Sequence, residues 1–224
     1  SFINYFDKDT EIYKGMKKID DDLGGTTPLN IILKFPTKKK EITDDDDFAE
    51  WEDENTEDKE KYWFTRNKID KIMMVHDYLD SLPEVGKVLS FGSIIRVAED
   101  LNKKKLESLE IAVLYSKIPK EIREEIVAPY ISINNDEARI SIRIKDSMKD
   151  LRRNELINKI NKELNTKLKL DVSEYKLSGV LILFNNLLQS LFKSQILTLG
   201  IVILGIFLMF FILFRNVVLS FIGV

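Results

Sequence analysis

The sequence predicts an α+β domain followed by a transmembrane α-helix. Three observations support this prediction. Strand-like runs alternate along the chain with helical periodicities, and the most regular strand pattern lies in a hairpin. The 21 residues from Ser194 to Phe214 carry no charge, although 32% of the chain is charged. Because an α-helix rises about 1.5 Å per residue, this stretch matches the thickness of the hydrocarbon core of a bilayer.

Composition excludes several classes of protein. The formal net charge is −3, from 34 Lys and Arg against 37 Asp and Glu, so the chain offers no broad basic field for nucleic acid. It contains no cysteine, which removes disulfides, thiolate metal sites and thiol catalysis. It starts at Ser1 without a basic segment followed by an apolar one. We therefore expect no signal peptide and interpret the chain as a fragment or a trimmed protein.

Residues 1–25 are predicted to hold an amphipathic helix that leads into the domain. The helical periodicity covers 10–23, with Asp9 or Thr10 as the N-cap and Gly24-Gly25 as the stop. Its apolar positions are Ile12, Met16, Ile19 and Leu23.

The α+β domain is predicted over 26–175, and its first strand is LNIILKF at 29–35, closed by Pro36. Residues 37–61 are expected to form an acidic, solvated and mobile loop, because twelve acidic and five basic residues occur within them. A calcium site is the alternative there. The runs DDDDF and DENTED lack the Gly and the Glu that a calcium loop needs at its sixth and twelfth positions, so we expect no metal.

The middle of the domain is predicted to be mainly helical. A helix is expected over 66–82, where the apolar residues are Ile69, Ile72, Met73, Leu79 and Leu82. VGKVLSF at 85–91 is predicted as a short strand. Three helical patterns then form an insertion, at 93–103, 106–118 and 119–127, the last opened by Pro119.

A hairpin, a helix and a strand complete the predicted domain. The hairpin pairs 130–134 with 137–145 around Asn135-Asp136. A helix is expected over 149–165, followed by a last strand in which Leu168, Leu170 and Val172 alternate. Without the insertion, this order approaches the β-α-β-β-α-β arrangement, a split β-α-β (ferredoxin-like) fold in which two helices cover one face of an antiparallel sheet.

Three residues of the sequence are candidate functional groups. His76 is the only histidine and follows Ile69 by seven residues, so it is expected on or beside the buried face of its helix. A base or proton relay is the alternative, but no companion nucleophile or metal-ligand pattern supports it. Arg139 and Arg143 are expected on a solvated sheet face, with contact to anionic headgroups as the alternative.

The C-terminal part is predicted to meet the membrane. Residues 176–193 are expected to form an amphipathic connector at the bilayer surface, because Asn185, Asn186 and Gln189 interrupt an uncharged run. The transmembrane helix is predicted at 194–214, where 15 residues are Leu, Ile, Val or Phe. A buried core helix is the alternative, but such helices are usually shorter and amphipathic.

Residues 215–224 are predicted to form a short cytoplasmic turn and the start of a second transmembrane helix. The turn contains Arg215, and VVLSFIGV follows it. Positive charge favours the cytoplasmic side, which places 1–193 outside the cytoplasm.

Catalytic motifs are absent from the sequence. It contains no phosphate-binding or dinucleotide-binding glycine loop, no nucleophile elbow and no zinc-protease motif. We therefore predict no enzyme activity, no catalytic residue and no cofactor. No motif identifies a substrate-binding residue.

Four segments resemble one membrane protein family. They are FDKDTEIYKGMKKIDDDLGGTTPLNIIL at 6–33, YWFT at 62–65, HDYLDSLPEVGKVLS at 76–90, and FRN after the span. In order and spacing they are similar to the first periplasmic loop and second transmembrane helix of resistance-nodulation-division (RND) exporters. The similarity is to the lipid-handling branch that includes the mycobacterial large membrane proteins (MMPL) and the hopanoid transporters.

The resemblance implies a multi-pass protein of the bacterial inner membrane, with 1–193 on the periplasmic side. It implies that 26–175 is a porter domain, and that proton-relay residues lie in a later helix. The implied function is proton-driven export of lipids or other hydrophobic molecules. The implied partners are that substrate, the bilayer, the remaining transmembrane helices and a second porter domain, with a second copy of the protein or a periplasmic protein left open. The alternative is an extracytoplasmic sensory or binding domain of a membrane-anchored signalling protein.

Overall fold

The first strand of the chain lies inside the sheet. The computed structural model describes residues 3, 6–35, 63–148 and 151–223. Strand β1 (Thr27–Lys34) pairs on one side with β4 (Glu137–Ile144) and on the other with β5 (Tyr175–Ser178), both antiparallel. Segments that are far apart in sequence therefore meet on either side of β1.

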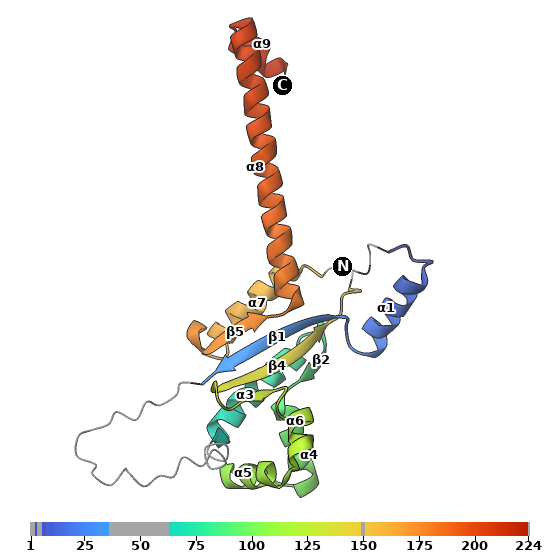
Figure 1. Cartoon of the computed structure of the whole chain (residues 1–224), viewed down its shortest axis with the longest axis vertical. Helices are drawn as coiled ribbons and strands as arrows, with labels where there is room; N and C mark the ends of the chain where they lie inside the picture. Colours follow the sequence, from blue (N-terminus) through green and yellow to red (C-terminus); the bar gives the residue numbers. More distant parts are fainter. Residues whose placement is uncertain (1–2, 4–5, 36–62, 149–150, 224) are drawn as a thin grey trace, which may run out of the picture. The chain divides into compact units, whose positions relative to one another are not determined.

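The sheet has five strands and is antiparallel at every pair. The order is β2-β4-β1-β5, where β2 covers Val85–Leu89, and the two-residue β3 (Ile131–Ser132) also pairs with β4 (Figure 1). The domain is thus of the α+β class, as the sequence predicts.

In the described part of the chain, one face of the sheet is buried. Along β4 the buried residues alternate with exposed or half-buried ones, and the same alternation runs through β1. The buried side chains of these two strands are Leu29, Ile31, Leu33, Ala138, Ile140, Ile142 and Ile144. The other face carries polar and basic side chains in contact with solvent, as the alternating pattern of the sequence predicts.

Two helices cover the buried face. They are α3 (Arg66–Asp80), with buried Ile69, Ile72, Val75 and Leu79, and α7 (Arg153–Thr166), with buried Leu156, Ile157, Ile160 and Leu164. The Tyr175 hydroxyl of β5 donates to the carbonyl of Asn161 in α7 at 3.0 Å. Burial, with the neighbouring Glu163 carboxylate of α7, raises the pKa of Tyr78 in α3.

The insertion between β2 and β3 consists of three short helices. They are α4 (Phe91–Asn102), α5 (Ser108–Lys117) and α6 (Lys120–Ile126). Arg66 at the start of α3 joins them to the rest of the domain, since its guanidinium lies 2.7 Å from the Glu99 carboxylate and 2.9 Å from the Leu106 carbonyl. The Ser108 hydroxyl accepts from the Arg66 backbone N–H at 2.8 Å. Arg66 is therefore one of the residues that attach the insertion to α3.

Helix α1 (Glu11–Asp22) is present where the sequence predicts it, with Thr10 as the N-cap. Its apolar side chains are largely exposed, including Ile12, Ile19 and Leu23, and its one buried residue is Asp20. The chain leaves α1 through Gly24 at φ 78°, where an added Cβ would lie 2.5 Å from the Gly86 carbonyl oxygen. Two backbones thus touch at a point where neither residue has a side chain.

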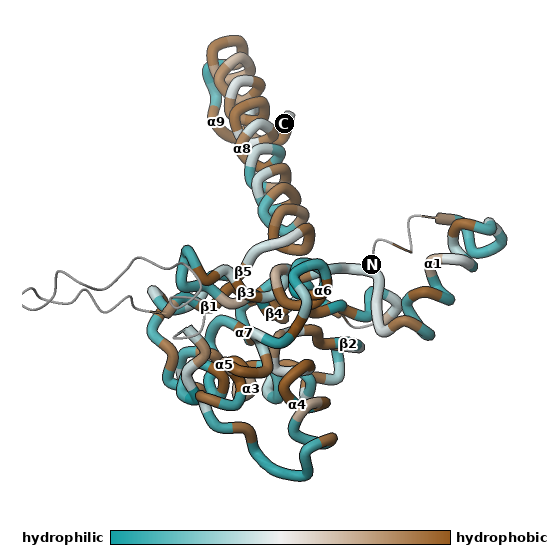
Figure 2. The backbone as a smooth tube through the Cα atoms, turned by 60° about the horizontal axis from the view of Figure 1, so that its bottom comes forward, coloured by the Kyte–Doolittle hydropathy of each residue, from teal (hydrophilic) through white to brown (hydrophobic). Residues whose placement is uncertain are grey.

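By compactness the chain divides into Ser1–Leu181 and Ile182–Val224. Helix α8 (Val180–Phe214) has 35 residues, with Lys193 as its one charged side chain, and is long and apolar enough to cross a membrane (Figure 2). It ends before Arg215, which has φ 50°. Asn216 then caps α9 (Val217–Ile222) by accepting from the Val218 N–H at 3.0 Å. The turn predicted at 214–216 is therefore present.

The predicted last strand is wrong. Residues 168–172 do not pair, because the N–H groups of Leu168 and Leu170 donate to carbonyls at the end of α7, and Lys169 between them has φ 54°. The 3₁₀ turn η3 (Val172–Glu174) follows, and the strand is β5 at Tyr175–Ser178. The first residues of the predicted connector, 176–178, thus belong to the sheet, and α8 continues from Val180 through 193 without a break. The predicted acidic loop at 37–61 lies outside the described residues.

Candidate functional site

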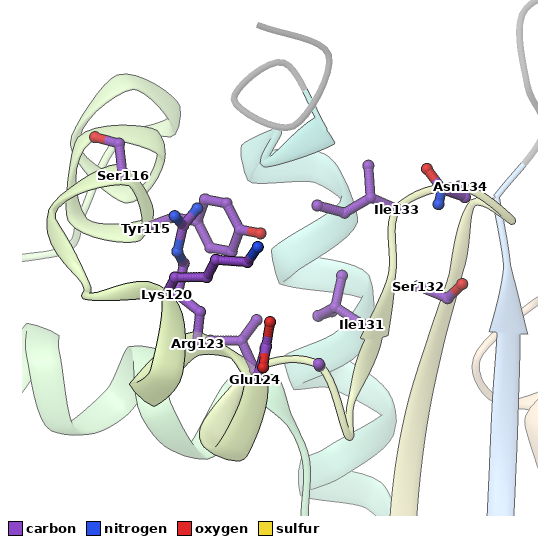
Figure 3. Close-up of a pocket in the computed structure, with 11 residues that line it drawn as sticks. Tyr115, Ser116, Lys120, Arg123, Glu124, Ile131, Ser132, Ile133 and Asn134 are labelled. Atoms are coloured by element: carbon purple, nitrogen blue, oxygen red, sulfur yellow. The ribbon is translucent and has the colours of Figure 1, made fainter. Parts of the chain in front are cut away.

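A cavity of about 550 Å³ lies between the helical insertion and β3 (Figure 3). This insertion cavity is lined by α5, α6 and the chain that runs through β3 into the hairpin turn. Its described lining residues are Tyr115, Ser116, Lys120, Arg123, Glu124, Val127, Ala128, Ile131, Ser132, Ile133 and Asn134. The volume is in the range of small-molecule binding sites, about 300–1,000 Å³.

The floor of the insertion cavity is apolar. Val127, directly after α6, is 2% exposed and Ile131 of β3 is 7% exposed. Ala128 and Ile133 add further apolar surface. These residues are held in place because Ile131 pairs with Ala138 of β4 and its N–H donates to the Val127 carbonyl at 3.0 Å. The apolar wall is thus part of the sheet and does not depend on a free loop.

The charged residues of the insertion cavity come from one face of α6. Lys120, Arg123, Glu124 and Val127 follow one another at i, i+3, i+4 and i+7, which places them on one side of a helix. Pro119 precedes Lys120 as the N-cap and fixes where this periodicity begins. Two cations and one carboxylate therefore line the cavity, with a sum of +1.

Tyr115 contacts both an aromatic cluster and a cation. Its ring is 4.4 Å from the Phe64 ring, centroid to centroid, and the Arg123 guanidinium lies over the Tyr115 ring at 5.0 Å from its centroid. Phe64 continues to Trp63 at 5.3 Å and Trp63 to Phe35 at 5.7 Å. Because Phe64 is 1% exposed, this contact chain holds Tyr115 and, through it, orients Arg123.

A second cavity of about 200 Å³ shares Ala128, Ile131 and Ser132 with the insertion cavity. Its further lining includes Ile32 of β1 and Arg139 of β4. The two-residue strand β3 therefore lines both cavities.

His76 is a buried histidine of α3, as the sequence predicts. Its side chain is 5% exposed, and Nδ1 lies 2.9 Å from the Ser90 hydroxyl. Ser90 also accepts the Gly92 N–H at 3.0 Å and caps α4. Burial, with the positive charge of Arg96, lowers the pKa of His76. His76 is not among the described lining residues of the insertion cavity, and its contact with Ser90 joins α3 to the start of α4.

Arg139 and Arg143 lie on the solvent face of the sheet. Both side chains are exposed, and they point away from the core because they alternate with Ala138, Ile140 and Ile142. Arg143 is paired with Lys87 of the neighbouring strand β2. Arg139 and Lys176 of β5 lie on either side of Ile32 of β1, which pairs with both. The structure thus brings these arginines into a basic sheet face, with Arg139 also at the edge of the smaller cavity.

Two buried aspartates lie at the other end of the domain. Asp20 and Asp146 are both 0% exposed. Asp20 accepts four hydrogen bonds, from the backbone of Thr26, Asp146 and Ser147 and from the Thr26 hydroxyl, at 2.8–2.9 Å. Asp146 accepts from the Arg153 guanidinium at 2.6 Å and from the Ile3 N–H at 3.3 Å. This cluster uses its carboxylates to join α1, the end of β4 and α7.

Metal ligation finds no support in the described part of the chain. Among those residues no three His, Cys, Asp or Glu side chains are arranged to hold an ion. The calcium alternative falls in 37–61, which lies outside them.

The residues of the insertion cavity were not identified from the sequence. The spacing of Lys120, Arg123, Glu124 and Val127 was the available signal, because it predicts a helix face with charges at one end and an apolar residue at the other. Nothing in the sequence shows that this face of α6 lies beside Ile131 and Ile133. The pairing of β3 with β4 that positions these residues exists only in the folded chain. Comparison with family models, with curated proteins and with solved structures finds no match for this chain.

Proposed function

We propose that this chain is the periplasmic porter portion, with the adjoining membrane helix, of a proton-driven RND-type exporter of lipids or other hydrophobic molecules. The observation that carries the proposal is the direct continuation of an α+β domain, through Gly179, into a 35-residue apolar helix. A domain of this kind next to a span suits a protein that gathers apolar molecules beside the bilayer and passes them outward.

The sheet topology supports the finer assignment of the domain. With the short β3 set aside, the strand order β2-β4-β1-β5 and the helices α3 and α7 on one face are the arrangement expected of a split β-α-β (ferredoxin-like) porter domain. On this assignment α4, α5 and α6 are an insertion between the second and third strands of the split unit.

The insertion cavity supports a binding role for the domain. It joins an apolar floor at Val127 and Ile131 to a charged rim, which is the lining a site for an amphiphilic molecule needs. The described lining contains no nucleophile activated by a neighbouring base. Binding and passage of a molecule therefore account for these residues better than its chemical conversion.

The membrane arrangement belongs to the same proposal. We place residues 1–193 on the periplasmic side of a bacterial inner membrane, the span within 194–214 and Arg215 on the cytoplasmic side. Helix α9 then starts the next span, since Ser220 is buried and an added Cβ on Gly223 would lie 3.3 Å from the Phe210 ring, so that α9 turns back along α8.

A sensory or binding domain of a membrane-anchored signalling protein is the second candidate. The observation in its favour is that the described residues hold one helix long enough to span a membrane, which is all that a tethered sensor needs. Such a sensor would use the insertion cavity to detect the molecule that the exporter would transport.

The test is a transport assay with the full-length protein. Reconstituted into liposomes and given an inward proton gradient, it should move a fluorescent lipid between leaflets or out of the vesicle, and a protonophore should stop the movement. Native mass spectrometry of the protein in its native lipids should find a lipid that is absent after deletion of 26–175. A kinase or cyclase domain following Val224, with no gradient-dependent transport, would overturn the proposal in favour of the sensor.

A further inference from the structure

We propose that the insertion cavity binds a monoanionic amphiphile, with its carboxylate between Lys120 and Arg123 and its apolar body against Val127, Ile131 and Ile133. This inference rests on the proposed function for its biological meaning, and on the geometry of the cavity for the ligand class.

The net charge of the residues that line the insertion cavity favours a ligand with one negative charge. Lys120 and Arg123 contribute two positive charges and Glu124 one negative charge, so the lining has a sum of +1. A single carboxylate neutralises this sum. A dianionic headgroup would leave an uncompensated negative charge next to Glu124, and a cationic amphiphile would meet two like charges.

Arg123 is positioned for carboxylate recognition. Its guanidinium lies over the Tyr115 ring at 5.0 Å, and Tyr115 is itself packed on Phe64. A guanidinium carries five N–H donors in a planar fork, and contact of its face with the Tyr115 ring uses none of them. Because the ring limits the rotamers of Arg123, less conformational entropy is lost when a ligand binds.

Lys120 supplies the second cation from the exposed start of α6. Its side chain lies one helical turn before Arg123 on the same face and reaches the same cavity (Figure 3). The two cations therefore lie on the α6 side of the cavity, whereas Ile131 and Ile133 lie on the β3 side (Figure 3). An amphiphile would bind with its charged end at α6 and its apolar end at the hairpin.

The size of the insertion cavity limits the ligand to a small amphiphile. A volume of about 550 Å³ is in the middle of the range for small-molecule sites. A single-chain molecule fits this space better than a headgroup with several chains. Dodecanoate is therefore the probe we choose.

The test uses the whole chain in lipid nanodiscs and a dodecanoate that carries a photoreactive diazirine at its apolar end. After irradiation, mass spectrometry should find the label on peptides that contain Val127, Ile131 or Ile133. Unlabelled dodecanoate should suppress this labelling at concentrations at least about tenfold lower than dodecanol or dodecyltrimethylammonium, because only dodecanoate has the matching charge.

Two variants with a matched control locate the site. Lys120→Gln should weaken the competition by dodecanoate about tenfold, as expected for the loss of one charge-assisted hydrogen bond. Ile133→Asp should also weaken the competition by dodecanoate, because it removes an apolar contact for the dodecanoate chain. Lys117→Gln removes an exposed lysine of the neighbouring α5 that does not line the cavity, and should leave the competition unchanged. Circular dichroism identifies any variant that fails to fold.

The outcomes separate this inference from the proposed function. Labelling that spreads over α8 and is not suppressed by excess dodecanoate, or competition that Lys120→Gln leaves unchanged, would overturn the inference. Saturable labelling in a full-length protein that moves no lipid under a proton gradient would keep the site and overturn the exporter. Gradient-driven transport without saturable labelling would keep the exporter and overturn the site.

Discussion

The Asp20 carboxylate accepts a hydrogen bond from the backbone N–H of Asp146 at 2.9 Å, across 126 residues of sequence. Asp20 is near the end of α1, and Asp146 follows the last residue of β4 by two positions. Because α1 buries no other side chain, this carboxylate is its main attachment to the domain. A charged group at 0% exposure is stable there because it accepts four hydrogen bonds.

Asp20→Asn should destabilise the domain by about 2–3 kcal/mol, because an amide cannot accept all four bonds and hydrogen bonds to charged groups contribute about 1.5–3 kcal/mol. Thermal unfolding of the purified chain measures the effect. Asp21→Asn is the matched control, since Asp21 is exposed and pairs only with Lys17 on the surface, where a loss of about 0.5 kcal/mol or less is expected. Equal effects of the two changes would contradict the attachment described here.

The stability of the domain should fall at acid pH through Asp20. Burial alone would raise the pKa of Asp20, but the hydrogen bonds from Ser147, Asp146 and Thr26 together outweigh burial and hold the pKa below its usual value. The native state thus resists protonation more than the unfolded chain, so the stabilisation is complete above about pH 4 and is lost as the pH falls below it. Unfolding of Asp20→Asn, followed from pH 6 to pH 2, should lack this part of the decline.

His76 should cause a second loss of stability, at higher pH than the loss through Asp20. The pKa of His76 is lowered by burial and by Arg96, against the weaker opposite effect of Asp80, so the native state favours the neutral ring. The unfolded chain takes up a proton below about pH 6.5, and stability is therefore lost as the pH falls from 7 to 5, by at most about 1.4 kcal/mol per pH unit. His76→Gln should remove this slope. A slope that persists in the variant would assign it to another group.

Two neighbouring residues of β1 should lose different amounts of stability on truncation. Ile31→Ala should cost about 2–5 kcal/mol, because Ile31 is 0% exposed in the core. Ile32→Ala should cost less than half of that, since Ile32 lies half-buried on the other face of the same strand. Denaturant midpoints measure both. Similar losses would mean that the solvent face of the sheet is covered by a part of the protein outside the described residues.

A charge in the middle of α8 should weaken its insertion into a membrane. Leu204→Arg costs about 2.5–3.5 kcal/mol on the insertion scale at a helix centre. Alkaline carbonate extraction of membranes should leave the unmodified chain in the pellet and release a fraction of this variant. Leu183→Arg, 21 positions earlier in α8 and outside the predicted span, should stay in the pellet. Release of the unmodified chain would contradict the span.

Periodic patterns predicted the helices of the α+β domain and all but one of its strands, whereas the predicted connector and span are one continuous helix, α8. The period-two alternation of β4 and the helical spacing of α3 and α7 gave correct elements because each has a single buried face. The last strand was misplaced because Leu168, Leu170 and Val172 also alternate. Of these three residues only Leu170 is buried, and it is part of the turn that ends α7.

The insertion cavity was beyond prediction for a different reason. Its residues lie in or directly beside α5, α6 and β3. The sequence pattern of each of these segments, taken alone, does not indicate a cavity. The segment around α1 shows the same limit, since the helical spacing of Ile12, Ile19 and Leu23 correctly predicts a helix, yet these side chains are exposed. Local pattern defines a helix but does not define its neighbours.

The interior position of β1 has a consequence for how the protein is made. Thr27 pairs with Ile144 and Lys34 with Glu137, so the first strand to be synthesised waits for more than a hundred residues before its first partner exists. Its second partner, β5, ends at Ser178, directly before α8. Such long-range pairing folds slowly, and until then β1 presents two unsatisfied edges and a strongly apolar face. During biosynthesis the β1 segment therefore stays unpaired until β4 has been made, and its second edge is paired only when α8 begins to emerge.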